Sequence, residues 1–161
     1  MKKEKYNFEC EVFDSIDLLP KEIQQLLAVA EDQLNYSYAP YSNFLVGAAA
    51  QLENGEIHAG CNQENASYPL CICAERVALY NVGSRHKDFI ITAMAITAHN
   101  PRKTLNEPCM PCGACRQVIQ EFEQRQNSPM DLYLTGDSGK IIKIAGIKNI
   151  LPLSFNINNL I

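Results

Sequence analysis

The sequence lacks any apolar run that could cross a membrane. No stretch approaches the roughly 18 uninterrupted apolar residues that a spanning helix requires, and the richest one, 89–98, is interrupted by two threonines. The start, Met-Lys-Lys-Glu-Lys, has the charge of a signal-peptide beginning, but Glu9, Glu11 and Asp14 occupy the place where an apolar segment would have to follow. The sequence therefore predicts a cytoplasmic protein with no membrane partner.

Positive charge is also scarce. Lys and Arg number 14 against 18 Asp and Glu, which gives a formal net charge of −4 at pH 7. Proteins that bind nucleic acids need a surplus of Lys and Arg for the phosphates, so this balance argues against a nucleic-acid partner. Gly and Pro, at 8 each, are near average usage, which excludes a fibrous or a disordered chain.

What the sequence does contain is enough apolar material for one core. The chain has 161 residues, of which 47% are hydrophobic. A domain of this length buries roughly 68–70% of the surface that its unfolded chain exposes, so it needs no disulfide. We expect an N-terminal arm at 1–19 and a single domain at 20–161, since the first residues are charged and show little periodicity.

Hydrophobic periodicity and turn signals predict three helices and five strands. Apolar residues recur every three or four positions after Pro20, and Asn-Gly at 54–55 is a strong hairpin signal. The continuous apolar run at 89–98 is typical of a strand covered on both faces. The expected helices are 20–36, 73–82 and 113–126, and the expected strands are 44–52, 56–61, 89–98, 131–135 and 140–145. This order predicts an α/β fold in three α/β/α layers with one mixed five-stranded sheet.

The cysteines are the most informative feature. There are seven, an odd number that suits a disulfide framework poorly, and five of them cluster: Cys71, Cys73, Cys109, Cys112 and Cys115. Cys112 and Cys115 are one helical turn apart and can share a metal ion, to which Cys73 would add a third sulfur. Three protein ligands with one position left for water are typical of a catalytic zinc, which lowers the pKa of that water.

The residues beside the cysteines fit a catalytic site. Zn²⁺ with three thiolates sums to −1, which weakens its effect on water, but two helix N-termini and Arg76 would offset this charge. Glu75 lies two residues beyond Cys73, where its carboxylate can reach metal-bound water without being a ligand. Arg76 and Gln117 are expected as hydrogen-bond donors to the thiolates, and Arg116 is a further candidate, although Arg116 and Gln117 fit equally well as solvated helix residues.

Two other readings stay open at this point. Cys109, Cys112 and Cys115 have the spacing of half an iron–sulfur run, with Cys71 or Cys73 as a fourth ligand, but that reading leaves Glu75 without a role. The second alternative is a structural zinc module that has no catalytic activity. The three histidines fall in no metal-ligand spacing and are expected on the surface or in loops: His58, His86 and His99.

Cys-x-Glu followed by Pro-Cys-x-x-Cys is the pattern of zinc-dependent base deaminases. The sequence closely resembles the cytidine deaminase family, whose members act on free nucleosides, from about residue 34 to 155. The resemblance is carried by Cys-Ala-Glu-Arg at 73–76, Pro-Cys-Gly-Ala-Cys-Arg-Gln at 111–117, and the segments 38–49, 60–68 and 151–155.

This resemblance implies a reaction and an assembly. The reaction is hydrolytic deamination of cytidine and 2′-deoxycytidine to the uridines plus ammonia, a step of pyrimidine salvage. The alternative substrate is another small aminopyrimidine, such as a modified or antibiotic nucleoside. The resemblance also implies a homotetramer in which a neighbouring chain's C-terminal Phe, here Phe155, caps the pyrimidine.

The resemblance also assigns roles to individual residues. One zinc per chain would be bound by Cys73, Cys112 and Cys115, and Glu75 would move protons. The implied nucleoside contacts are Phe44 on the pyrimidine, Asn62 and Glu64 on the ribose hydroxyls, and the backbone at Ala74 on the edge of the base.

Overall fold

The computed structural model describes residues 1–160 and confirms the predicted helices and strands nearly throughout. Five short 3₁₀ turns lie between or after the main elements. The helices and strands are β1 (Glu11–Phe13), α1 (Lys21–Asp32), β2 (Leu45–Leu52), β3 (Ile57–Cys61), α2 (Ala74–Arg85), β4 (Ile91–His99), α3 (Gly113–Gln126), β5 (Asp131–Leu134) and β6 (Ile141–Ala145).

The sheet is mixed, as predicted, but it has six strands rather than five. Its order is β1-β6-β5-β4-β2-β3, with β4 and β5 parallel and the other neighbours antiparallel. The additional strand is β1, in the arm, which pairs with β6 and places Glu11 opposite Lys143. This segment is only three residues long and mostly exposed, so it shows no hydrophobic periodicity from which a strand could be predicted. It becomes a strand because it pairs with the edge strand β6.

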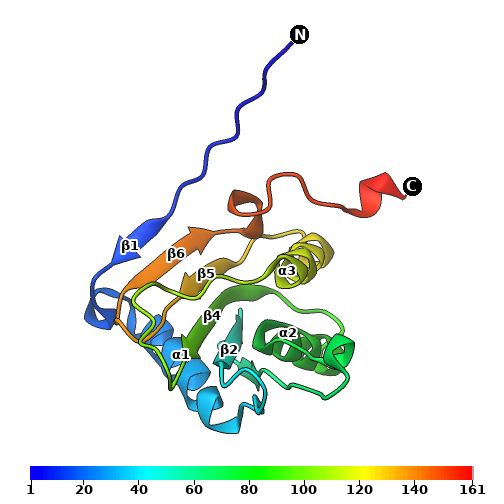
Figure 1. Cartoon of the computed structure of the whole chain (residues 1–161). Coiled ribbons are helices and arrows are strands. Elements are labelled where there is room, and N and C mark those ends of the chain that lie inside the picture. Colours follow the sequence, from blue (N-terminus) through cyan, green and yellow to red (C-terminus); the bar gives the residue numbers. More distant parts are fainter. Residues whose placement is uncertain (161) are drawn as a thin grey trace.

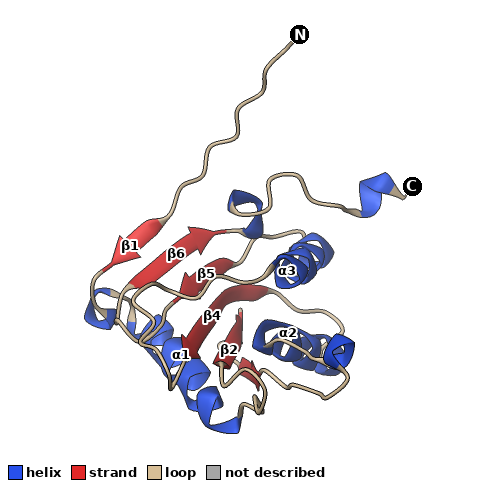
Figure 2. Ribbon diagram, in the orientation of Figure 1, coloured by secondary structure: helices blue, strands red, loops and turns tan. Residues whose placement is uncertain are grey.

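Helices cover both faces of the sheet, which confirms the three layers (Figure 2). Helix α1 packs on one face through four buried residues: Ile23, Leu26, Leu27 and Ala30. Helices α2 and α3 lie on the opposite face, over a larger core that includes Leu79, Ile96, Ile119 and Phe122. Strand β4 is buried between the two layers, as its apolar run predicted.

Helix α2 lies unusually close to β3. A Cβ atom placed on Gly60 would come within 2.6 Å of Val77 Cγ1 and 2.7 Å of the Ala78 amide nitrogen. Only glycine leaves room for this approach. The contact fixes the position of α2 along β3, and so it also fixes the positions of the residues at the two ends of the helix, Cys73 and His86.

Both ends of the chain leave the body of the molecule (Figure 1). Residues 1–10 are exposed and project away from the sheet, whereas β1 joins the rest of the 1–19 arm to it. No helix in residues 1–160 is long and apolar enough to cross a membrane.

Candidate active site

The starts of two helices bring the three predicted sulfur ligands together. Cys73 is the N-cap of α2, Cys112 is the N-cap of α3, and Cys115 is the third residue of α3. Both N-cap residues are extended, and their side chains make no capping hydrogen bond. The sulfurs are therefore free to face one another across the two helix ends.

The sulfur positions fit zinc. Cys73 Sγ lies 4.0 Å from Cys112 Sγ, and Cys112 Sγ lies 3.5 Å from Cys115 Sγ. Sulfurs bound to a tetrahedral zinc at about 2.3 Å stand about 3.8 Å from one another. These three residues form a group that can hold a metal ion, and the donor set is one that zinc prefers.

The electrostatics of the group favour thiolate at Cys73. The pKa of Cys73 is lowered to about 5, chiefly by its hydrogen bond with Cys115 and also by Arg76. The pKa of Cys115 is raised, because it shares that hydrogen bond with the Cys73 sulfur and is largely buried. Each N-cap sulfur also lies at the positive end of a helix dipole.

Arg76 contacts the group as the sequence predicted. Its guanidinium Nη2 donates to Cys73 Sγ at 3.5 Å and to the Cys71 carbonyl at 3.4 Å. These bonds place a positive charge beside the sulfurs, which partly offsets the net negative charge of a zinc with three thiolates.

Glu75 is buried in the first turn of α2, beside the sulfurs. Its residue is 4% exposed, and burial raises the pKa of its carboxyl, with the charge of Cys73 acting in the same direction. The carboxyl therefore lies close to the metal group without being one of the three grouped ligands. This is the position from which a carboxyl can exchange protons with a bound water and a substrate.

The segment with Asn62 and Glu64 is joined to the chain just before Cys73. Gln63 exchanges both backbone hydrogen bonds with Ile72, and the Glu64 amide donates to the Tyr38 carbonyl. The Asn62 side chain accepts from the Val46 amide and donates to the Phe44 carbonyl, both at 2.8 Å. Asn62 thus holds the start of β2 and keeps further donor and acceptor capacity for a ligand.

The Glu64 carboxylate lies on the same side of the molecule as Tyr41 and Ser42. It accepts from both of their amides, and with Cys71 and Tyr68 these residues line a cavity of about 320 Å³. The hydrogen bonds from Ser42 hold the pKa of Glu64 below its usual value. Another cavity, of about 790 Å³, lies on the α1 side of the sheet and does not include the cysteine group.

Gln117 and Arg116 bind backbone carbonyls. Gln117 Nε2 donates to the Phe155 carbonyl at 2.8 Å, and Arg116 donates to the carbonyls of Pro111 and Ile150. Among residues 1–160, no hydrogen bond joins either side chain to a sulfur. Both instead hold the chain's C-terminal segment beside α3, and the side chain of Phe155 remains exposed.

Cys109 stands outside the metal group, although an iron–sulfur run would require it. Its Sγ lies 3.9 Å from the Met110 carbonyl, and burial raises the pKa of its thiol to about 11. A neutral thiol packed against the core is a poor metal ligand. The geometry thus favours three cysteines and not a fourth.

Comparisons with known proteins agree with this geometry. A family model described as the cytidine and deoxycytidylate deaminase zinc-binding region matches residues 20–128. A cytidine deaminase of Sporosarcina psychrophila is 38% identical over 136 residues, 84% of this chain and 92% of that protein. One from Halalkalibacterium halodurans is 39% identical over 134 residues, 82% of this chain and 92% of that protein.

A solved structure supports the same assignment. The crystal structure of cytidine deaminase from Burkholderia pseudomallei superimposes with a TM-score of 0.70 at 36% identity, and the match covers 81% of this chain and 97% of that one. The family model spans more than half of the chain and includes all three grouped cysteines. On the sequence, the fold and the grouped sulfurs together, the chain belongs to the zinc-binding cytidine and deoxycytidylate deaminase family.

Proposed function

We propose that this protein is a zinc-dependent hydrolase that converts cytidine and 2′-deoxycytidine to uridine and 2′-deoxyuridine plus ammonia, a step of pyrimidine salvage. The observation that carries the proposal is the meeting of three sulfurs at the starts of α2 and α3 beside a buried carboxyl, Glu75. An ammonia-release screen over free bases, nucleosides and nucleotides tests it. Release from cytidine is the expected result, and a zinc-loaded chain that releases none would contradict it.

In this proposal Cys73, Cys112 and Cys115 bind one zinc per chain. When bound, the zinc supplies a Lewis acid that makes water a nucleophile near neutral pH. The two helix N-termini and Arg76 balance the thiolate charge, so that the metal keeps this effect. Gln117 contributes by holding the C-terminal segment at the edge of the site.

Glu75 carries the proton steps of the proposal. Its carboxylate accepts a proton from the attacking water and delivers it to N3 of the ring, while the water oxygen bonds to C4. A second proton passes through Glu75 to the amino group on C4, which leaves as ammonia. The burial of Glu75 keeps bulk water from competing for these protons.

Asn62 and Glu64 are proposed to bind the ribose hydroxyls, with Phe44 on the pyrimidine and the Ala74 backbone at the edge of the base. The backbone bonds between Gln63 and Ile72 support this, because they fix the Asn62–Glu64 segment next to Cys73. A site built for hydroxyls leaves its own polar groups unpaired when the hydroxyls are missing.

Free cytosine is therefore expected to be a far poorer substrate than cytidine, by roughly 10⁴-fold in kcat/KM. Steady-state kinetics on both compounds measure this ratio. Asn62→Ala should narrow this ratio, because the loss of its bonds to β2 affects both compounds whereas the loss of a ribose contact weakens cytidine only. Asn65→Ala, three residues further along the same segment, is the matched control. Equal kcat/KM for cytosine and cytidine would contradict the ribose contacts.

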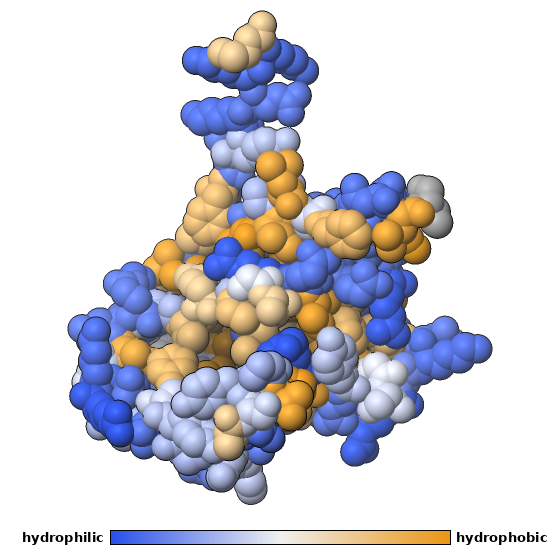
Figure 3. Space-filling view, turned by 45° about the vertical axis from the view of Figure 1, so that its right-hand side comes forward, coloured by the Kyte–Doolittle hydropathy of each residue, from blue (hydrophilic) through white to orange (hydrophobic). Residues whose placement is uncertain are grey.

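A homotetramer with a shared site is also part of the proposal. The C-terminal segment exposes large apolar side chains, including Leu153 at 75%, Phe155 at 59% and Leu160 at 71%. Hydrophobic surface, in orange, is visible at this end of the molecule in Figure 3. Such side chains at a chain end gain stability by burial against another copy. We expect Phe155 to reach an adjacent subunit's site and cap the base.

Light scattering should then give about four times the 18.0 kDa chain mass. Phe155→Ala should raise KM for cytidine by roughly 10-fold or more and leave the zinc content unchanged, since a buried aromatic contact is lost but no ligand. Tyr36→Ala removes another exposed aromatic, in the 3₁₀ turn that follows α1, and serves as control. A fully active monomer would rule out the shared site.

A cytoplasmic location fits the cysteine chemistry. All seven cysteines are free thiols in the structure, as is usual for proteins of a reducing compartment. Alkylation of the cysteines in intact cells, followed by fractionation, tests this location. Disulfide-linked chain in an exported fraction would contradict it.

A further inference from the structure

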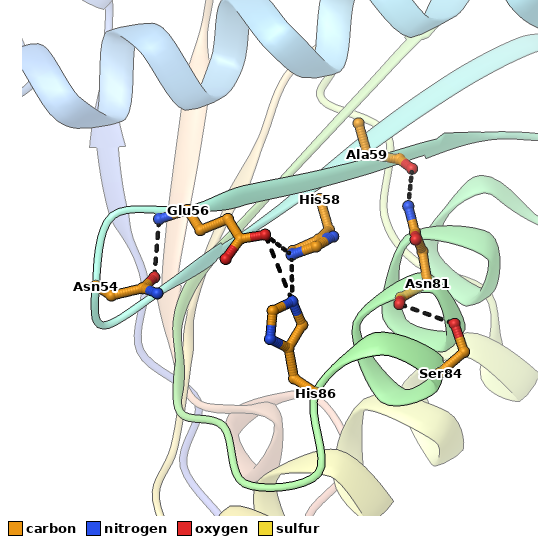
Figure 4. Close-up of polar contacts among 7 residues, drawn as sticks. All are labelled: Asn54, Glu56, His58, Ala59, Asn81, Ser84 and His86. Carbon is orange, nitrogen blue, oxygen red and sulfur yellow. Dashed lines mark hydrogen bonds and ion pairs between the residues drawn. The ribbon is translucent and has the colours of Figure 1, made fainter.

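A second group of possible metal ligands lies at the other end of α2 (Figure 4). Glu56 precedes β3, His58 lies within β3, and His86 is the residue that ends α2. The expectation that His58 lies on the surface or in a loop is wrong, because the residue is 6% exposed and lies on the same face of β3 as Gly60, toward α2. The group joins residues that are 28 positions apart in sequence.

The three ligand atoms form a tight triangle. His58 Nε2 lies 3.0 Å from Glu56 Oε1 and 2.9 Å from His86 Nε2, and His86 Nε2 lies 3.5 Å from the same Glu56 oxygen. Two ligand atoms about 2.05 Å from a tetrahedral zinc lie about 3.3 Å apart. The observed separations bracket that value.

Hydrogen bonds cannot satisfy all three contacts of this triangle at once. A carboxylate oxygen only accepts, so each histidine would need a proton on Nε2 to bond with Glu56. The contact between the two Nε2 atoms instead requires one of them to present a lone pair. A cation at the centre removes the conflict, because both nitrogens and the carboxylate oxygen then point lone pairs at it.

The surroundings hold the three residues in place. Asn54 Oδ1 accepts from the Glu56 amide at 3.0 Å and fixes the hairpin turn, and Asn81 Nδ2 donates to the Ala59 carbonyl at 3.3 Å and ties α2 to β3. The close approach at Gly60 keeps the helix and strand together. Glu56 is half-exposed, which leaves a route from solvent to the centre of the triangle.

We propose that Glu56, His58 and His86 form a second metal site, for a divalent transition ion of the zinc class, which clamps the end of α2 to β3. Two imidazole nitrogens and one carboxylate oxygen are a donor set that zinc takes in proteins, with water in the remaining position. The site is separate from the cysteine group, because the 12 residues of α2 place the two ends of the helix about 18 Å apart.

Zinc stoichiometry tests the proposal. After equilibrium dialysis against a large excess of zinc, elemental analysis should find about two ions per wild-type chain and about one in His86→Ala and in Glu56→Gln. Both changed positions are partly exposed, so these variants should fold. His99→Ala is the matched control, since His99 pairs with Asp137 at 2.7 Å elsewhere on the molecule and should keep two ions.

Further measurements separate this site from the cysteine site. Cys112→Ala should still bind one zinc in the same dialysis, whatever becomes of its activity. Saturating zinc at a hundred times the dissociation constant should raise the wild-type melting temperature by roughly 5–10 °C, and not that of His86→Ala. A wild-type chain that stays at one zinc, or a His86→Ala chain that keeps two, would overturn the proposal.

Discussion

Replacing Glu75 by Gln is expected to lower kcat for cytidine by more than about 10⁴-fold while zinc stays bound. A single general acid–base group contributes roughly 10²–10⁴-fold, and Glu75 is proposed to act both in the attack of water and in the departure of the amine. Gln keeps the shape of the side chain in a position that is 4% exposed, but it cannot exchange a proton. Zinc content and single-turnover rates on the same sample measure the two effects separately.

Glu123→Gln is the matched control for this variant. Glu123 is also buried, and its Oε1 accepts from the amides of Met130 and Ile147, away from the sulfurs. Gln can keep both bonds, so activity per folded chain should stay near wild type. A Glu75→Gln protein within tenfold of wild type would refute the proposed role.

The second large effect concerns the metal. Cys112→Ala should abolish cytidine deamination and reduce the zinc at the cysteine site from about one per chain to near zero, because two thiolates without the third bind zinc much more weakly. Cys112 is exposed at an N-cap, so the change costs little packing. Elemental analysis without added zinc, together with ammonia release, reports both losses.

Cys109→Ala is the control for the ligand assignment. Cys109 is three residues away, but its thiol faces the core and the Met110 carbonyl and not the other sulfurs. Zinc and activity should both be retained. Loss of the metal in Cys109→Ala alone would show that the wrong cysteines had been assigned.

Much of the fold follows from local sequence signals. Helix α3 occupies the predicted range 113–126, and α1 begins directly after Pro20, which turned out to be the N-cap and not the first helical residue. The metal group was predictable because short spacing and helix starts put Cys112 and Cys115 on one turn. Cys73 was predicted as the third ligand from its place at another helix start, but its contact with the other two depends on the packing of the two helices.

The features that could not be predicted depend on contacts between distant segments. Strand β1 has three residues and exists through pairing with β6. The approach of His58 to His86 depends on α2 lying against Gly60, which no spacing rule encodes. The hydrogen bond from Gln117 to the Phe155 carbonyl could not be predicted either, since the two residues are 38 positions apart and no local pattern links them.

We expect the three grouped cysteines to hold a zinc that is required for deamination of cytidine. The most direct test is ammonia release from cytidine, measured on one sample as purified, after complete removal of metal by a chelator, and after zinc is restored. The account predicts release, then none, then recovery, with uridine formed in step with ammonia. Undiminished release from the metal-free chain would contradict it.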